Sequence, residues 1–160
     1  MELKTVKLEI PYGCNVILGH SHFIKTVEDI YEIMMSSISS AKFGLAFSEA
    51  SEKRLVRKDG TDMELIDAAV RNIEKLSAGH SFIIILKDAF PINVLNALKQ
   101  CFEVVNIFCA TANPVEVILA KSEQGCGILG VIDGYSPLGV ENEKDIKERT
   151  EFLQKIGYKR

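Results

Sequence analysis

The chain has 160 residues, of which 47% are hydrophobic and 26% charged, and its formal net charge is −3. This is the composition of a globular protein, and a chain of this length buries a core without needing disulfides or a structural metal. We expect one domain spanning residues 1–160. The sequence has no basic cluster for nucleic acid and no apolar stretch long enough to span a membrane, so neither is expected as a partner.

The cysteines and the amino-terminal residues predict the cellular compartment of the protein. Cys14, Cys101, Cys109 and Cys126 show no Cys-x-x-Cys spacing. The first residues lack the apolar core of a signal peptide. We therefore expect free thiols and a cytoplasmic location.

Hydrophobic periodicity predicts the elements of the first half of the chain. Residues 6–10 alternate as in a half-exposed strand, and residues 15–18 are expected to pair with them antiparallel. Apolar residues at helical spacing predict a helix that begins at Thr26, with a capping box formed by Thr26 and Asp29. In order, we expect a strand at 6–10, a turn at 11–13, a strand at 15–18, a helix from 26 to 38, a strand at 43–47 and a turn at 58–60.

The second half continues the alternation of helices and strands. Thr61 and Glu64 predict a second capping box, and Gly79 a glycine at the end of that helix. In order, we expect a helix at 62–76, a strand buried on both faces at 80–86, a short helix at 91–99, strands at 103–110, 115–120 and 128–133, and a terminal helix at 141–156 whose residues Ile146, Phe152, Leu153 and Ile156 face inward. The order predicts an α/β fold with a mixed, partly parallel sheet and helices packed on its faces.

The loop at residues 19–25 precedes the first expected helix and carries His22 and Lys25. The first turn of a helix has unpaired N–H groups and a partial positive charge, which favour anions. Both side chains could contact a phosphate there, and His22 could act as a nucleophile or an acid–base group. The pattern alone favours the alternative, a polar loop with a surface lysine.

Acidic residues follow on the polar face of this helix. Glu28 and Asp29 are favourable in a first turn, and a solvated face is the simpler interpretation. Beside a phosphate, both could instead hold Mg²⁺, which prefers carboxylate oxygens. His20 and His22 could form half of a zinc site, but no second His/Cys cluster supplies the other ligands.

Three further features each have a structural and a functional interpretation. Residues 125–130 match Gly-x-Gly-x-x-Gly. The dinucleotide-binding motif requires a helix after these glycines, whereas a strand and a turn are expected here. The glycines are therefore expected to permit close packing or a bulge. Asp133 ends a strand, where it forms a turn or reaches into a cleft. His80 begins a buried strand and is by default a core or rim histidine. The sequence has no P-loop or protein-kinase signature.

Five sequence motifs follow one another along nearly the whole chain. They are Gly-His-Ser-His-Phe-Ile-Lys-Thr-Val-Glu-Asp (19–29), Gly-His-Ser-Phe-Ile-Ile-Ile-Leu (79–86), Pro-Ile-Asn-Val-Leu-Asn-Ala-Leu (91–98), Phe-Cys-Ala-Thr-Ala-Asn-Pro (108–114) and Gly-Val-Ile-Asp-Gly (130–134). In these motifs the chain closely resembles the small archaeal and bacterial adenosine-specific kinases. The resemblance implies an α/β protein that forms homo-oligomers, trimers or multiples of them, and binds adenosine, AMP, ADP or ATP.

The resemblance also implies a histidine that carries a phosphoryl group. We assign it to His22, assisted by Lys25, with His80 in reserve, and expect Mg²⁺ at Glu28 and Asp29. The predicted nucleotide-binding residues are Ser48, Glu49, Thr111, Asn113, Asp133 and Gly134. The predicted activity is a nucleotide-dependent phosphotransferase; the alternatives are a non-catalytic sensor of adenine nucleotides and a structural or assembly protein.

Overall fold

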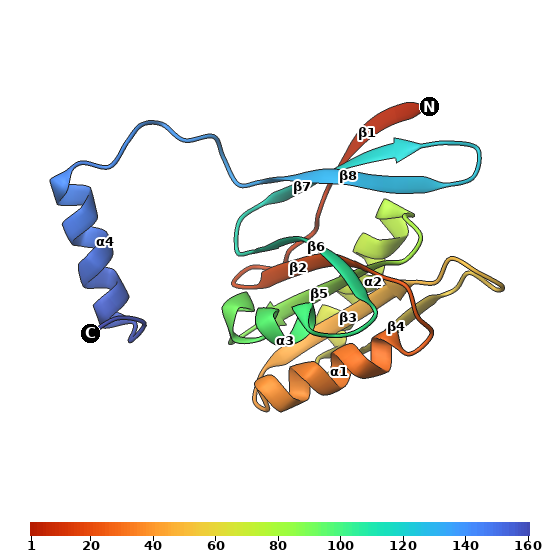
Figure 1. Cartoon of the computed structure of the whole chain (residues 1–160), viewed down its shortest axis with the longest axis horizontal. Helices are drawn as coiled ribbons and strands as arrows, with labels where there is room; N and C mark the ends of the chain where they lie inside the picture. The colour runs from red at the N-terminus through yellow and green to blue at the C-terminus, as the bar shows by residue number, and fades with distance from the viewer.

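Eight strands form two sheets in the computed structural model, which describes residues 1–160 (Figure 1). The strands are β1 (Glu2–Lys7), β2 (Asn15–Ser21), β3 (Lys42–Ser48), β4 (Val56–Gly60), β5 (Ser81–Lys87), β6 (Val104–Thr111), β7 (Val115–Lys121) and β8 (Cys126–Asp133). The helices are α1 (Thr26–Ser37), α2 (Met63–Leu76), the 3-10 turn η1 (Pro91–Asn93), α3 (Leu95–Lys99) and α4 (Glu143–Lys155). The predicted α/β class is confirmed.

The larger sheet has the order β4-β3-β5-β2-β6 and the smaller one β1-β7-β8. All of their strand pairs are antiparallel, so the expected parallel pairing was wrong. The crossover through α1 does give β2 and β3 the same direction, but β5 lies between them and runs opposite to both. Likewise β3 separates β4 from β5, the strands that α2 connects. Each helical crossover therefore skips one strand.

The partner of the first strand also differs from the expectation. β1 pairs with β7, with Val6 opposite Val117, and not with β2. The segment around Gly13 (φ 75°) therefore carries the chain from one sheet to the other and does not close a hairpin. Local alternation placed the strand at residues 6–10, whereas β1 spans Glu2–Lys7, and its partner lies more than a hundred residues away in the sequence.

The core has one cluster on each face of the larger sheet. On one face Ile30 and Met34 of α1 pack with Phe82 and Ile84 of β5. On the other face α2 and the smaller sheet share a cluster with Ile83 and Ile85. β5 is thus buried on both faces, as predicted, because consecutive side chains of a strand point to opposite sides.

The helix starts differ from the predicted capping boxes. At α1 the N-cap is Lys25, and the Thr26 hydroxyl donates to the Phe23 carbonyl at 2.6 Å. At α2 the cap is Asp62, whose carboxylate accepts from the Leu65 N–H at 3.2 Å. Each predicted boundary was therefore within one residue, while the capping side chain was wrong.

The end of α2 and the strand before this helix also differ in detail from the prediction. α2 ends at Ser77 in the left-handed conformation (φ 51°), not at Gly79. Residues 58–60, predicted as a turn, end strand β4. Gly44 of β3 permits the close approach of α2, because a Cβ there would lie 2.1 Å from the Leu65 carbonyl carbon.

The carboxyl-terminal helix packs against no core, contrary to the expected inward-facing stripe. No residue of α4 is buried, and Phe152 is 59% exposed. Figure 1 shows α4 standing apart from the sheets at the end of an extended segment, residues 134–142. Near its end Tyr158 meets Phe90 edge to face at 6.3 Å between ring centroids. None of the helices has the length and apolar character needed to cross a membrane.

Candidate functional site

A cavity of about 1160 Å³ lies where the two sheets meet the carboxyl end of α2. His20 of β2, Ser48 of β3 and the loop that follows β3 form part of its wall. His80 and the β7–β8 turn at residues 122–127 form another part. Gly125 and Gly127, two of the three glycines of the Gly-x-Gly-x-x-Gly match, thus line the cavity from a hairpin, without the helix of a dinucleotide-binding motif.

The backbone around this cavity is unusually strained. Of the five non-glycine residues with positive φ, three line the cavity: Arg54 (φ 50°), Ser77 (φ 51°) and His80 (φ 60°). A fourth residue with positive φ, Glu52 (φ 49°), lies in the same loop as Arg54. Such conformations are costly for non-glycine residues and concentrate at ligand-binding and active sites.

His80 is fixed by both neighbouring strands. Its N–H donates to the Ser48 carbonyl at 2.7 Å, and its carbonyl accepts from the Ser21 N–H at 2.9 Å. The imidazole stacks on Phe47, with ring centroids 5.9 Å apart and planes 14° from parallel. Its Nε2 lies 3.4 Å from a carboxylate oxygen of Glu49, and its side chain is 29% exposed. His80 is thus a rim histidine with a hydrogen-bond partner, which was the default interpretation. Because His80 lines the cavity, a ligand bound there can reach it.

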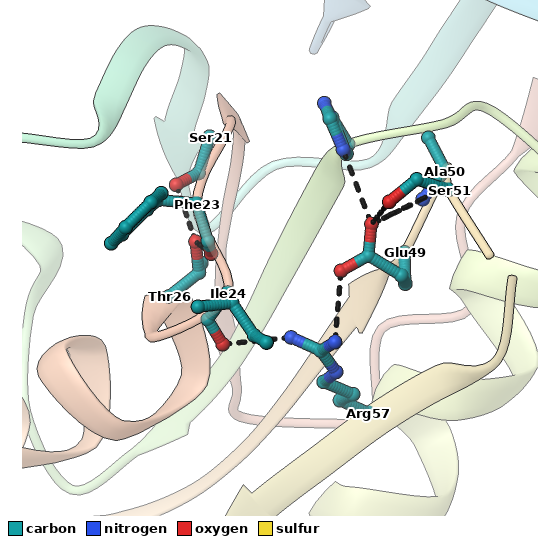
Figure 2. A network of polar contacts seen from close by, with 9 residues as sticks. Ser21, Phe23, Ile24, Thr26, Glu49, Ala50, Ser51 and Arg57 are labelled. Carbon is teal, nitrogen blue, oxygen red and sulfur yellow. Dashed lines mark hydrogen bonds and ion pairs between the residues drawn. The ribbon is translucent and has the colours of Figure 1, made fainter. Parts of the chain in front are cut away.

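Glu49 is the centre of the polar network in Figure 2. One carboxylate oxygen accepts from the N–H groups of Ala50 (2.9 Å) and Ser51 (3.2 Å). The other pairs with Arg57 at 2.9 Å. Burial raises the pKa of Glu49, but the hydrogen bonds from Ser51, Ala50 and His80 outweigh it and hold the pKa below its usual value. Glu49 is therefore an anion at neutral pH.

Arg57 connects this carboxylate to the loop before α1. Its guanidinium donates to the Ile24 carbonyl at 2.7 Å while it pairs with Glu49 (Figure 2). The predicted residues Ser48, Glu49 and His80 therefore lie together, and Arg57 links them to the loop that carries His22. Arg57 was missed because a lone arginine on an expected surface segment gives no sequence signal.

His20 is the second histidine of the cavity, and its ring centroid lies 6.3 Å from that of His80. Burial lowers the pKa of His20, and the neighbouring His80 and His22 lower it further, so the ring is neutral at neutral pH. The sequence pattern indicated His20 only as a possible zinc ligand. Strand alternation was the available signal, since it places His20 on the same face as Leu18 and opposite to Ser21.

His22 and Lys25 lie on the exposed loop between β2 and α1. The His22 N–H donates to the Glu103 carbonyl at 3.2 Å, and its ring makes no hydrogen bond. The Lys25 ammonium pairs with Asp29 at 2.8 Å, and this bond raises the pKa of Lys25 and lowers that of Asp29. Asp29 also lies close to Cys101 and Glu103, whereas Glu28 is exposed and outside that group.

The remaining predicted residues gather elsewhere. Asn113 donates through its side chain to Asp133 at 3.2 Å and through its N–H to Thr111 at 3.0 Å, and Gly134 lies beside Asn113. Thr111 is opposite Val16, at the start of β2, whereas His20 is near its end. At about 3.3 Å per residue, four residues along a strand span about 13 Å. Within one chain this group is therefore separate from the cavity of His20 and His80.

The fold and the cavity define a small α/β protein with a histidine–carboxylate pair at an open ligand-sized site. The chain belongs to the family described as adenosine specific kinase, whose sequence profile matches residues 6–159. It is similar to the PH1918 protein from Pyrococcus horikoshii OT3, known from a crystal structure, with 40% identity and a TM-score of 0.95. That match covers 99% of this chain and 98% of the other. No curated protein matches the chain.

Proposed function

We propose that the chain is a phosphotransferase that binds adenosine or an adenine nucleotide in the cavity of His20 and His80 and works through a phosphorylated histidine. Membership of the adenosine-specific kinase family supports the ligand and the reaction class. The cavity, at about 1160 Å³, has room for a nucleotide, since sites for small ligands typically measure about 300–1000 Å³.

The observation that carries the proposal is the pair formed by His80 and Glu49. A carboxylate at Nε2 fixes the tautomer that carries its proton there and leaves Nδ1 with a free lone pair. Nδ1 of His80 attacks the γ-phosphorus of ATP, the bond from that phosphorus to the bridging oxygen breaks, and ADP leaves with the electron pair. The proton stays on Nε2, where Glu49 stabilises the positive charge that the ring acquires. His22, the residue assigned from the resemblance, lacks such a partner, so the geometry favours the reserve histidine.

The cavity also provides charge for the phosphates. Lys53 and Arg54 line it, and phosphoryl transfer depends mainly on positioning and on neutralising charge. In this proposal Mg²⁺ enters with the nucleotide phosphates. The assignment of Mg²⁺ to Glu28 and Asp29 stays a prediction, and the pairing of Asp29 with Lys25 does not favour it.

The test is a comparison of His80→Asn and His22→Asn after incubation with ATP and Mg²⁺. Asparagine tolerates positive φ better than most residues, so His80→Asn retains the backbone conformation at φ 60°. Intact mass at alkaline pH should show one added phosphate in the wild type and in His22→Asn, lost after brief acid treatment. His80→Asn should gain none.

The alternatives predict other results. A mass gain in His80→Asn that is absent from His22→Asn would return the role to His22. No mass gain in a wild-type protein that ATP stabilises against heating would support the non-catalytic nucleotide sensor. No effect of any adenine nucleotide on thermal stability would favour a structural or assembly protein.

We further propose that the chain forms a homo-oligomer, a trimer or a multiple of one, in which α4 packs against a second copy. The segment before α4 exposes Leu138 and Val140 almost completely, and α4 adds Phe152. A monomer rarely leaves so much apolar surface uncovered. A second copy could also bring the group of Thr111 and Asn113 to the cavity of its neighbour, which one chain cannot do.

A further inference from the structure

Glu103 is a buried carboxylate without a hydrogen-bond partner. The residue is 2% exposed, and neither of its carboxylate oxygens has a hydrogen bond. It lies immediately before β6, where its backbone carbonyl accepts from the His22 N–H. A buried carboxylate is costly unless a cation or hydrogen-bond donors compensate its charge. No ion pair of the protein compensates this carboxylate directly, and its polar side-chain neighbours are Asp29 and Cys101.

Two other possible ligands lie beside it. Asp29 reaches the position from α1 and Cys101 from the end of α3, and one ligand atom of each of the three residues lies within 4.8 Å of the others. Asp29 and Cys101 also line an open groove of about 450 Å³, so a small ion has access to the group. The groove shares no lining residue with the cavity of His20 and His80.

We propose that Asp29, Cys101 and Glu103 bind one divalent transition-metal ion of the Zn²⁺ or Co²⁺ class. Two carboxylate oxygens and a thiolate sulfur suit a tetrahedral ion whose fourth position faces the groove and holds water. A thiolate ligand selects against Mg²⁺ and Ca²⁺, which prefer oxygen ligands only. The site shares Asp29 with the predicted Mg²⁺ site at Glu28 and Asp29, but its other ligands and its metal differ. It does not rest on the proposed phosphotransfer.

Charge balance explains the role of Lys25 at this site. The Lys25 ammonium holds Asp29 at 2.8 Å, so it competes with a metal ion for that carboxylate. When the ion binds, the Cys101 thiol releases one proton to solvent, because metals bind the thiolate. The two carboxylates and the thiolate then carry three negative charges around the divalent ion. Because the Lys25 ammonium competes with the ion for Asp29 and repels its positive charge, removing the lysine charge should strengthen metal binding.

The experiment uses the full chain, freed of metal with a chelator and titrated with Co²⁺. We expect one equivalent to bind, with a near-ultraviolet thiolate-to-cobalt charge-transfer band that Zn²⁺ abolishes and Mg²⁺ does not. Cys101→Ser should lose the band, while Cys126→Ser, which changes a cysteine in the smaller sheet, should keep it. Asp29→Asn and Glu103→Gln should each weaken Co²⁺ binding by about tenfold or more. Lys25→Met should strengthen it.

Circular dichroism and thermal melting of each apo variant separate lost binding from lost folding. Glu103→Gln should fold, since it removes an uncompensated charge, and it keeps the assignment testable if Asp29→Asn does not fold. The proposal is overturned if the folded wild type binds no Co²⁺, if the band persists in Cys101→Ser, or if Mg²⁺ displaces Co²⁺. A folded Glu103→Gln variant with unchanged Co²⁺ affinity would also overturn it.

Discussion

The imidazole of His80 contacts Glu49 at 3.4 Å, and this pair joins two segments that are far apart in the sequence. Glu49 follows β3, His80 precedes β5, and these strands are neighbours in the larger sheet. Arg57 extends the connection to the loop before α1. A change at Glu49 is therefore expected to affect the orientation of the histidine as well as the stability of the loop.

Glu49→Gln should slow the formation of phosphohistidine. The amide can still hydrogen-bond, but it carries no charge to stabilise a positive imidazole ring. In a time course of intact mass with ATP, the variant should reach the same end point as the wild type at a reduced rate. Glu52→Gln, in the same loop, is the matched control and should behave as the wild type. An unchanged rate in Glu49→Gln would argue against a catalytic pair.

The same variant should alter the dependence of stability on pH. The pKa of Glu49 is below the ordinary value of 4.5, so its anion stabilises the folded state above that pH. This contribution is lost as the pH falls from 4.5 through the lower pKa of the folded state. Thermal melts from pH 7 to pH 3 should therefore show a shallower acid loss in Glu49→Gln than in the wild type. Parallel curves would contradict the network in Figure 2.

Gly44→Ala should destabilise the fold by about 3 kcal/mol, since the new Cβ overlaps the backbone of α2 at Leu65. Urea denaturation followed by circular dichroism measures the change. Gly139→Ala is the control, because a Cβ at that glycine has no atom within 4 Å, and its free energy of unfolding should be unchanged. Equal stability of the two variants would mean that α2 can move away from β3 at little cost.

Asn72→Ala should also destabilise the protein, by about 2–3 kcal/mol. The fully buried amide of Asn72 accepts from the Glu9 N–H and donates to the Glu9 and Ala68 carbonyls, so its loss leaves the partly buried backbone N–H and carbonyl of Glu9 without these partners. Asn96→Ala, at an exposed helical position, should have a much smaller effect in the same denaturation experiment. Comparable losses would show that the Asn72 hydrogen bonds contribute little.

Oligomerisation should require the apolar side chains of α4. Replacing Ile146, Phe152 and Ile156 together with serine should convert the oligomer to a monomer in light scattering after gel filtration, with little loss of secondary structure. Lys147→Ser is the control on the same helix. If Thr111 and Asn113 serve a neighbouring copy, then Asn113→Ala should weaken nucleotide binding in the oligomer and leave that of the monomeric variant unchanged. An oligomer that survives the triple substitution would exclude α4 as its contact.

Local sequence patterns were sufficient for most elements. The helical spacing of the apolar residues predicted α1 and α2, and the uninterrupted apolar run at residues 82–86 predicted a strand buried on both faces. These signals are local, since each depends on residues within a few positions of one another. The apolar spacing near Phe152 predicted α4 equally well, but the period alone does not say which surface its apolar side covers.

Tertiary structure alone decided which strands are neighbours and which side chains meet. The pairing of β1 with β7, the contact of His80 with Glu49, and the grouping of Asp29 with Cys101 and Glu103 all join segments distant in the sequence. Such contacts depend on how whole elements bury their apolar faces against each other, and no pattern within one segment encodes that choice. The sequence thus determined the elements, the α/β class and the resemblance to the adenosine-specific kinases. The packing of the two sheets decided where the histidines, carboxylates and arginine come together.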